Sequence, residues 1–351
     1  MVKDAVPLQE CARALVIKLR HHGDVLLAAP VLGVLKAHAP RLEIDALVYD
    51  DTAPMLEGHP ALAQLHTVGR KWRGKGFVER LFLERQLFQT LKQRSYDVIV
   101  HLSEQPRGAW LARALGARYS VAPAMPDRGR FWRKSFTHLY PIARRRHQVE
   151  VNLDALRRLG VQPTLNERRV TFVPGPEAEN RVEPLVQEPF IHVHPASRWS
   201  FKCWPAAKNA ELIDRFAAEG HNVVLTASPD PQEMSFVEEI LSKVRTTPLS
   251  LAGKLSLKEL GAVAARAQLF VGVDSMPMHL AAAMGTPTVA LFGPSGEAQW
   301  GPWNADSRVV STTHSCRPCG LDGCGGGKVS DCLVTLPVDA VHAAARELLA
   351  R

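Results

Sequence analysis

No stretch of this sequence approaches the roughly 20 consecutive apolar residues that a helix needs to cross a bilayer. The first twenty residues, MVKDAVPLQECARALVIKLR, also lack a basic segment followed by an apolar core and a cleavage site. We therefore expect neither a membrane-spanning helix nor a secretory signal, and we expect the protein to be cytoplasmic.

Signatures of nucleic-acid-binding modules are missing as well, although the chain is basic, with a net charge of +8 and a pI of about 9.3. Seven Lys or Arg residues and no acidic residue fall between positions 128 and 146. A solvated basic face explains this segment as well as an anionic substrate or an anionic membrane surface does. Nucleic acid ranks last among the candidate partners.

The chain has 351 residues, more than one hydrophobic core usually spans, so two domains are expected. Near-continuous apolar strands alternate with helical segments in both halves, which indicates an α/β fold with parallel sheets covered on both faces. We predict two doubly wound, Rossmann-like domains, residues 1–175 and 176–351, facing a central cleft. Ligands of such sheets bind beyond the carboxyl ends of the strands.

The apolar pattern predicts individual elements in each half. In the first half the strands are at 14–19, 44–48 and 97–102, and the helices at 25–35, 79–93 and 106–115. Pro30 should kink or shorten the first helix. The Pro- and Glu-rich stretch 174–189 is predicted to connect the domains. In the second half the strands are at 190–194, 222–226, 249–251, 269–273 and 288–292, and the helices at 206–219, 232–241, 256–266, 277–284 and 338–349.

The motif KLRHHGD, residues 18–24, lies where the first predicted strand ends and the first helix begins. Gly23 permits a tight turn, and Asp24 falls at a helix N-terminus, where the helix dipole favours a carboxylate. Taken alone, Asp24 is more often explained as an ordinary helix cap.

A second motif, HPASRWSFKCWP at residues 194–205, also begins where a strand ends. Ser197 and nearby backbone N–H groups can donate hydrogen bonds to a phosphate, and Lys202 can place a positive charge on a diphosphate. Trp199 and Trp204 fit core packing at least as well as stacking on a base.

The third motif, GVDSMPMHLAAAMGTP at residues 272–287, joins a strand to a helix. Ser275 suits the N-cap and Pro277 the first helical turn. Free N–H groups at such a helix start bind phosphate. His279 lies one turn after Ser275 and can point at the same ligand, the alternative being a hydrogen-bonded core histidine.

Four of the six cysteines crowd into 17 positions of a Gly-rich segment, at Cys316, Cys319, Cys324 and Cys332. In a cytoplasmic chain this clustering favours a metal site over disulfides, and four thiolates would hold a structural Zn²⁺ or iron ion. Reduced free thiols, or a disulfide formed on isolation, are together an equal alternative.

In this order and spacing, the motifs resemble the ADP-heptose:lipopolysaccharide heptosyltransferases, glycosyltransferase family 9, over nearly the whole chain. The residues that carry the resemblance are the motif at 18–24, KCWP at 202–205, and Asp274 and Ser275 with PMH at 277–279. Within the family, KLRHHGD, DSMPMH and the tail CRPCGLDGCGGGKVSDCL are most similar to the heptosyltransferase III branch.

The resemblance implies a GT-B fold and an inverting transfer of heptose from ADP-L-glycero-D-manno-heptose to the lipopolysaccharide inner core, without a catalytic cofactor. The first domain would bind the acceptor and the second the ADP-heptose donor, on or near the cytoplasmic face of the inner membrane. Asp24 would be the general base, and Lys202 would hold the diphosphate. The other implied donor residues are Ser197, Glu233, Asp274, Ser275, Met276 and His279, and the acceptor residues are Arg20, His21, His22, Arg144 and Arg145.

The sequence departs from the pattern of the best-known family members in two places. Arg20, His21 and His22 stand where those members have Ser or Thr, which predicts a different acceptor. Met276 stands where they often have Gly, which predicts a different backbone contact to phosphate.

Two rival functions share these motifs. A sibling transferase would use another acceptor or another nucleotide sugar. A non-catalytic nucleotide-sugar-binding protein would have no need of a base at Asp24. No DxD-like pair stands in a convincing loop, and inversion at a sugar carbon requires only a base and a cationic or N–H cradle for the departing phosphate.

Overall fold

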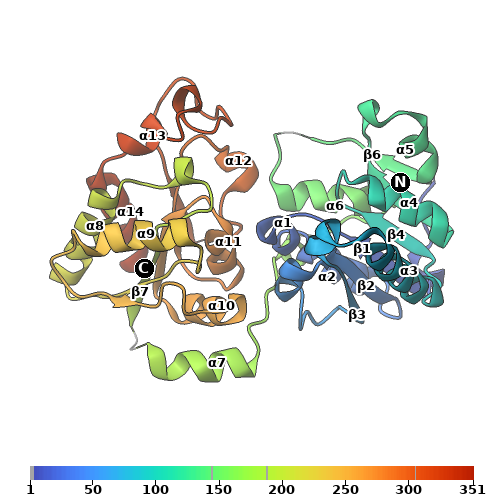
Figure 1. Cartoon of the computed structure of the whole chain (residues 1–351), viewed down its shortest axis with the longest axis horizontal. Helices are drawn as coiled ribbons and strands as arrows, with labels where there is room; N and C mark the ends of the chain where they lie inside the picture. The colour runs from blue at the N-terminus through green and yellow to red at the C-terminus, as the bar shows by residue number, and fades with distance from the viewer. Residues whose placement is uncertain (1–3, 144, 187–188, 305) are drawn as a thin grey trace. The chain divides into compact units, whose positions relative to one another are not determined.

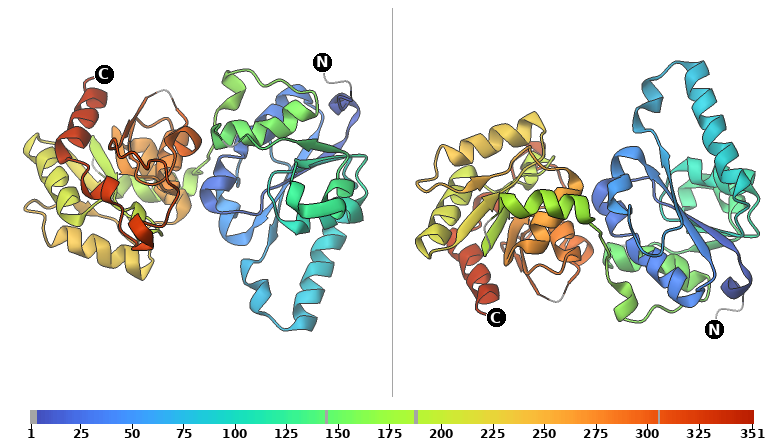
Figure 2. Two further views of the ribbon diagram at one scale, coloured as in Figure 1. Left: turned by 90° about the horizontal axis from the view of Figure 1, so that it is seen from above. Right: turned by 90° about the horizontal axis from the view of Figure 1, so that it is seen from below.

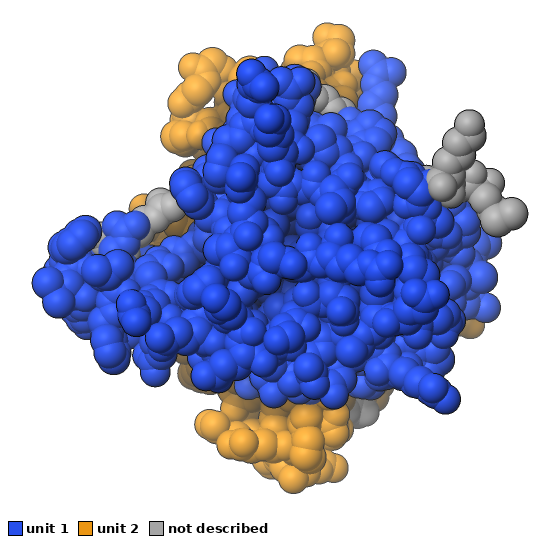
Figure 3. All heavy atoms as spheres, turned by 90° about the vertical axis from the view of Figure 1, so that its right-hand side faces the viewer, with its two compact units in different colours: residues 1–172 blue, residues 173–351 orange. Residues whose placement is uncertain are grey.

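The chain folds into two compact units, Met1–Phe172 (unit 1) and Val173–Arg351 (unit 2), coloured separately in Figure 3. The computed structural model describes residues 4–143, 145–186, 189–304 and 306–351. Each unit contains one six-stranded parallel sheet with helices on its faces, which confirms the predicted α/β class (Figure 1). The unit boundary falls three residues before the one expected from the sequence.

Unit 1 has the strand order β3-β2-β1-β4-β5-β6. Its strands are β1 (Arg13–Ile17), β2 (Glu43–Tyr49), β3 (Gln64–Val68), β4 (Val98–His101), β5 (Tyr119–Pro123) and β6 (His138–Tyr140). Its α-helices are α1 (His22–Leu26), α2 (Ala29–His38), α3 (Phe77–Gln93), α4 (Pro106–Leu115), α5 (Gly129–Ser135) and α6 (Gln148–Arg158).

Helices cover both faces of this sheet (Figure 2). Side chains of α3, α4 and α5 share one core with β1 and β4, including Leu91, Ala109 and Trp132 around Leu15 and Ile99. Helix α2 packs against α6. The strand order reverses between β1 and β4, and their carboxyl ends mark the ligand-binding edge in a doubly wound sheet.

Unit 2 has the order β12-β11-β10-β7-β8-β9, the same topology with the same reversal, here between β7 and β10. Its strands are β7 (Phe190–His194), β8 (Asn222–Leu225), β9 (Leu249–Ser250), β10 (Leu269–Val273), β11 (Thr288–Leu291) and β12 (Ser307–Val310). Its helices are α7 (Pro176–Val182), α8 (Ala206–Ala218), α9 (Pro231–Leu241), α10 (Leu257–Arg266), α11 (Met276–Ala283), α12 (Glu297–Trp300), α13 (Asp331–Val334) and α14 (Val338–Leu349).

Prolines and glycines shape the start of unit 1 differently from the sequence expectation. The predicted helix 25–35 is two helices, because Pro30 lies in the first turn of α2 and separates it from α1. Gly23 lies inside α1, which already begins at His22, and not in a tight turn before the helix. No helix in the described ranges is long and apolar enough to cross a membrane.

A buried carboxylate on β2 ties the C-terminal end of α3 to the sheet. Asp45 is fully buried and accepts hydrogen bonds from Arg94 Nε at 2.7 Å and Tyr96 Oη at 2.7 Å. His66 Nε2 lies 3.4 Å from the same carboxylate. Burial alone would raise the pKa of Asp45, but these hydrogen bonds outweigh it and lower the pKa to about 2.

We predict that Arg94→Met lowers the free energy of unfolding by about 3 kcal/mol at about pH 7, because the substitution leaves a buried carboxylate without its cation. The folded-state pKa of Asp45 lies below its unfolded value of about 3.9, so its stabilisation is present above that value and is lost as the pH falls toward 2. Urea unfolding of the variant at several pH values measures both effects. The double variant Asp45→Asn, Arg94→Met should recover part of the loss, and an unchanged single variant would contradict the prediction.

Candidate functional site

The predicted base Asp24 lies in the first turn of α1, directly after the carboxyl end of β1. Its side chain is 13% exposed, so one side remains accessible to a ligand. Arg20 Nε lies 3.8 Å from Asp24 Oδ1. Asp24 therefore lies beside a cation at the start of the helix, with part of its carboxylate open to solvent.

The first residue of this motif is a buried lysine that joins it to neighbouring elements. Lys18 Nζ donates to the Leu102 carbonyl at 2.9 Å and to Asn152 Oδ1 at 3.0 Å. Burial lowers the pKa of Lys18 to about 8, and the charge of Asp24 partly opposes that decrease. Asn152 Nδ2 in turn donates to the Leu27 carbonyl at 2.8 Å, so α6 contacts both the first residue of the motif and the C-terminal end of α1.

The three residues that distinguish this motif from the family pattern stand around Asp24. Arg20 and His21 are exposed, and His22 is half-buried. His22 Nε2 donates to the Asp51 carbonyl at 2.9 Å. Arg70 donates to the Arg20 carbonyl at 3.1 Å and to Asp51 Oδ2 at 2.8 Å, which fixes the segment before α3 against the motif.

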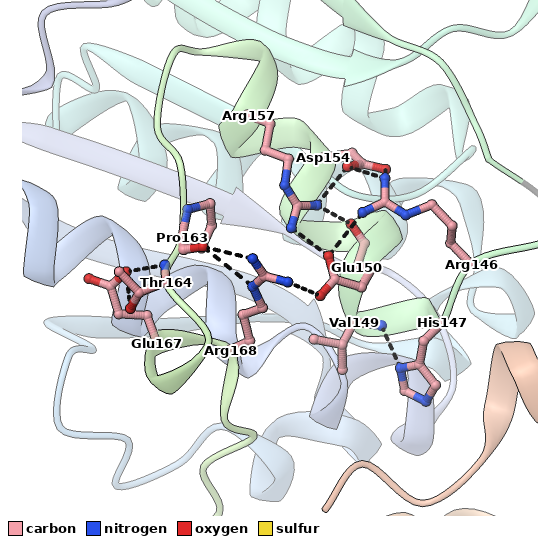
Figure 4. A network of polar contacts seen from close by, with 10 residues as sticks. All are labelled: Arg146, His147, Val149, Glu150, Asp154, Arg157, Pro163, Thr164, Glu167 and Arg168. Carbon is pink, nitrogen blue, oxygen red and sulfur yellow. Dashed lines mark hydrogen bonds and ion pairs between the residues drawn. The ribbon is translucent and has the colours of Figure 1, made fainter.

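The basic stretch 128–146 forms α5, β6 and the segment that leads into α6. Arg145 is exposed, whereas Arg144 lies outside the described residues. Arg146 donates to both carboxylate oxygens of Asp154 at 2.8 Å and to Glu150 at 2.9 Å. Figure 4 shows that Arg157 pairs with the same two carboxylates. The charge of Arg146 is therefore already paired with acidic residues of unit 1.

A single ion pair joins two of the predicted donor residues in unit 2. Strands β7 and β10 are neighbours, with Gly272 opposite His194, so the loops that follow them meet at the point where the strand order reverses. Lys202 ends a 3₁₀ turn, η7 (Ser200–Lys202), after β7. Its Nζ donates to Asp274 Oδ2 at 2.6 Å, and the two side chains are 23% and 6% exposed.

Helix α11 starts next to this pair. Ser275 occupies its N-cap, but the hydroxyl donates to the Val273 carbonyl at 3.3 Å and makes no capping hydrogen bond. Met276 is the first helical residue, directly after the ion pair and the cap. His279 is buried one turn later, with its ring 6.5 Å from that of Trp300.

Ser197 and Glu233 line a cavity of about 270 Å³ in unit 2. The Glu233 carboxylate, in the first turn of α9, accepts a hydrogen bond from Ser228 N at 3.0 Å. Trp204 and residues 328–330 complete part of the lining, and Lys202 and Asp274 are not among the lining residues. Trp204 is fully buried and donates to the Leu336 carbonyl at 3.1 Å, which is the core role that the sequence left open.

Sequence reasoning missed the contribution of residues 328–330 to this cavity. Ser330 Oγ donates to the Phe201 carbonyl at 2.6 Å, which attaches the Cys-rich segment to the loop that carries Lys202. Only the position of Ser330 beside the cysteines could have drawn attention to it, and such a position does not predict a contact 129 residues away.

The Cys-rich segment does not form a ligand set for a metal in this structure. Cys332 is buried and the other three thiols are exposed. Burial raises the pKa of the Cys332 thiol, and the charges of Cys324 and Cys319 add to the increase. Among the described residues, however, no three His, Cys, Asp or Glu side chains are arranged to hold a metal ion.

A family model and individual known proteins are similar to this chain in sequence. Residues 84–329 match the family model described as glycosyltransferase family 9 (heptosyltransferase). A lipopolysaccharide heptosyltransferase 3 from Escherichia coli is 38% identical over 292 residues, 82% of this chain and 85% of the relative. The protein of that name from strain K12 is 36% identical over 290 residues, 81% of this chain and 83% of the relative.

Solved structures agree with these matches. The glycosyl transferase family 9 structure from Veillonella parvula has a TM-score of 0.85 at 25% identity and 99% coverage of both chains. The E. coli heptosyltransferase WaaC with ADP has a TM-score of 0.75 at 22% identity, covering 96% of this chain and 99% of that one. The second match is evidence for the GT-B fold alone. The family model over residues 84–329 and the relatives at 36–38% identity show that the chain belongs to glycosyltransferase family 9, the heptosyltransferases.

Proposed function

We propose that this glycosyltransferase moves heptose from ADP-L-glycero-D-manno-heptose to the inner core of lipopolysaccharide, with inversion, as a heptosyltransferase III. The observation that supports the proposal is the Lys202–Asp274 pair at the strand-order reversal of unit 2, because ligands of doubly wound sheets bind at such a reversal and a diphosphate there needs a cation. The identity of 36–38% to lipopolysaccharide heptosyltransferase 3 supports the donor and acceptor classes.

In the proposed mechanism unit 1 binds the acceptor and Asp24 removes the proton from its hydroxyl. The acceptor oxygen then forms a bond to the anomeric carbon, while the bond from that carbon to the ADP phosphate breaks. ADP leaves with the bonding electron pair, and Lys202 with the N–H groups at the start of α11 stabilises its charge. No catalytic cofactor takes part in these steps.

The remaining predicted residues have separate proposed roles. Glu233 and Ser197 bind the nucleoside part of the donor in the cavity that they line. Asp274 orients Lys202, and Ser275, Met276 and His279 surround the diphosphate end. Arg20, His21, His22 and Arg145 bind the anionic acceptor, with Arg144 as a further candidate. A sibling transferase with another acceptor is the second candidate, favoured by the unusual residues 20–22.

We predict that Asp24→Asn lowers turnover by about 10²-fold or more and leaves ADP binding unchanged, because the amide cannot accept the hydroxyl proton. Incubation with ADP-heptose and truncated lipopolysaccharide cores, followed by mass spectrometry, measures the transfer. Glu10→Gln is the control and should keep normal turnover, since it changes an exposed carboxylate of unit 1 that precedes β1, at the opposite end of this strand from Asp24. Near-normal turnover of Asp24→Asn would reject the assignment, and no transfer by the wild-type protein to any core would reject the proposed acceptor.

We predict that Lys202→Ala weakens ADP binding by at least about tenfold, because it removes the cation and leaves the Asp274 carboxylate beside the diphosphate. The difference from wild type should shrink as salt rises. Calorimetry measures the affinity. Lys243→Ala is the matched control. Lys243 lies just after the C-terminal end of α9, whereas Glu233 lies in the first turn of this helix, and Lys243 pairs with Glu239 on the surface. Unchanged ADP affinity would show that Lys202 has another role.

We further propose that the Cys-rich segment binds one structural Zn²⁺ or iron ion when its exposed part closes on Cys332. The clustering of four cysteines within 17 positions supports the proposal. The closure is required because three of the thiols are exposed and the described residues form no metal-holding group. The transfer reaction does not depend on this metal.

Elemental analysis of protein purified without a metal-affinity step should then give close to one metal per chain. The double variant Cys316→Ser, Cys319→Ser should contain none and should unfold at a lower temperature, because the Gly-rich segment lacks a core of its own. A metal-free protein of full stability and activity would rule the metal out without affecting the transferase assignment.

A further inference from the structure

Helix α3 carries apolar side chains that its own unit does not bury. Phe77, Val78, Leu81 and Phe82 are 80%, 79%, 58% and 65% exposed, and we call them the apolar face of α3. Their spacing places them on one side of the helix. Four large neighbouring apolar side chains at such exposure mark an interaction surface, whereas single exposed residues are ordinary.

This face belongs to a part of α3 that extends past the core. Leu87, Phe88 and Leu91, further along the helix, pack in the core of unit 1, and Arg94 fixes the end of the helix to Asp45. The N-terminal turns project from the rest of unit 1 (Figure 2). The apolar face of α3 is therefore part of a helix whose C-terminal half is packed in the core of unit 1.

Positive charge surrounds the apolar face. Residues 70–86 contain six Lys or Arg against two Glu, and both of these Glu residues pair with a cation, Glu79 with Lys75 and Glu84 with Arg107. The neighbouring helices α4 and α5 carry five basic residues and no acidic one along their described lengths, namely Arg107, Arg113, Arg130, Arg133 and Lys134.

Aromatic rings extend the surface from α3 across α4 to α5. Trp110 is 63% exposed and its ring centre lies 4.7 Å from that of Phe131, while Arg113 lies over the Phe131 ring at 5.4 Å. The Arg107–Glu84 pair, at 2.5 Å, joins α4 to α3. Exposed Trp, Phe and Leu among Lys and Arg is the composition of surfaces that lie in the headgroup region of a membrane.

We propose that the apolar face of α3, with the cations of α3, α4 and α5, docks unit 1 onto an anionic lipid bilayer. The apolar side chains enter the boundary between headgroups and acyl chains, and the cations bind lipid phosphates. A second copy of the chain fits less well, because pairing this face with itself would bring two clusters of like charge together.

The docking surface is linked to the predicted base. Arg70, just before α3, donates to the Arg20 carbonyl in the motif that contains Asp24. Docking would therefore hold Asp24 near an acceptor embedded in the same membrane. This deepens the proposed function and rests on it for its purpose, whereas the docking can be measured without donor or acceptor.

The test compares the wild-type chain with the triple variant Phe77→Gln, Leu81→Gln, Phe82→Gln by co-sedimentation with vesicles. Vesicles of phosphatidylglycerol and phosphatidylethanolamine should bind the wild type, and phosphatidylcholine vesicles should bind it far less. The triple variant should bind the anionic vesicles at least about tenfold more weakly, since three apolar anchors are lost. Leu165→Gln, which changes a side chain 79% exposed in the same unit, is the matched control and should bind as wild type.

Three further readouts separate the alternatives. The triple variant should keep its unfolding temperature, remain in the same oligomeric state as wild type, and transfer heptose normally to a deacylated, water-soluble acceptor while losing activity on acceptor in vesicles. Equal vesicle binding by wild type and variant, or no binding by wild type, would overturn the proposal. A lower unfolding temperature or dissociation of an oligomer in the variant would also overturn it, by showing that the face packs against protein. Failure of both proteins on the soluble acceptor would count against the proposed function alone.

Discussion

The reversal of strand order in each sheet is the constraint on which both candidate sites depend. In unit 2 it places the loops after β7 and β10 side by side, so Lys202 and Asp274, 72 residues apart in the chain, form a direct ion pair. In unit 1 the same reversal brings the end of β1 next to that of β4, where Lys18 Nζ reaches the Leu102 carbonyl. In each unit a lysine thus joins the two loops at the reversal point: Lys202 is partly exposed and Lys18 is buried.

Much of the fold was accessible from the sequence because the central strands are continuous apolar runs. The strand 190–194 was predicted with its observed bounds. Four of the described strands were missed. The edge strands β3 (QLHTV), β6 (HLY) and β12 (SRVV) carry polar residues that interrupt the apolar pattern, and the inner strand β5 (YSVAP) is short and ends in Pro. Helix α7 lies inside the predicted connecting stretch, where Pro and Glu suggested irregular chain. Its Ala178 and Val182 pack in a core with α10, so tertiary contact decides its structure.

The sequence predicted which loops form the candidate sites, but it did not predict the contacts that their residues make. The linear order of 18–24, 194–205 and 272–287 identified the loops, because each follows an apolar strand. Contacts between residues far apart in the chain cannot be inferred from the local sequence. Arg145 and Arg146 are neighbouring arginines in one basic segment, but only Arg146 pairs with carboxylates of α6, whereas Arg145 is exposed. The contact of Ser330 with the Phe201 carbonyl is equally invisible in the sequence.

Each unit is completed by residues near its own C-terminal end, which has a consequence for folding during synthesis. The contact between Lys18 and Asn152 spans 134 residues, nearly the whole of unit 1, yet it does not involve unit 2. The contact between Trp204 and Leu336 spans 132 residues of unit 2 in the same way. The described core of unit 1 is therefore present once Phe172 has emerged from the ribosome, so unit 1 can fold before unit 2 is translated. Unit 2 must wait for nearly the last residue of the chain, and a nascent chain stalled before Leu336 would hold a folded first unit and an incomplete second one.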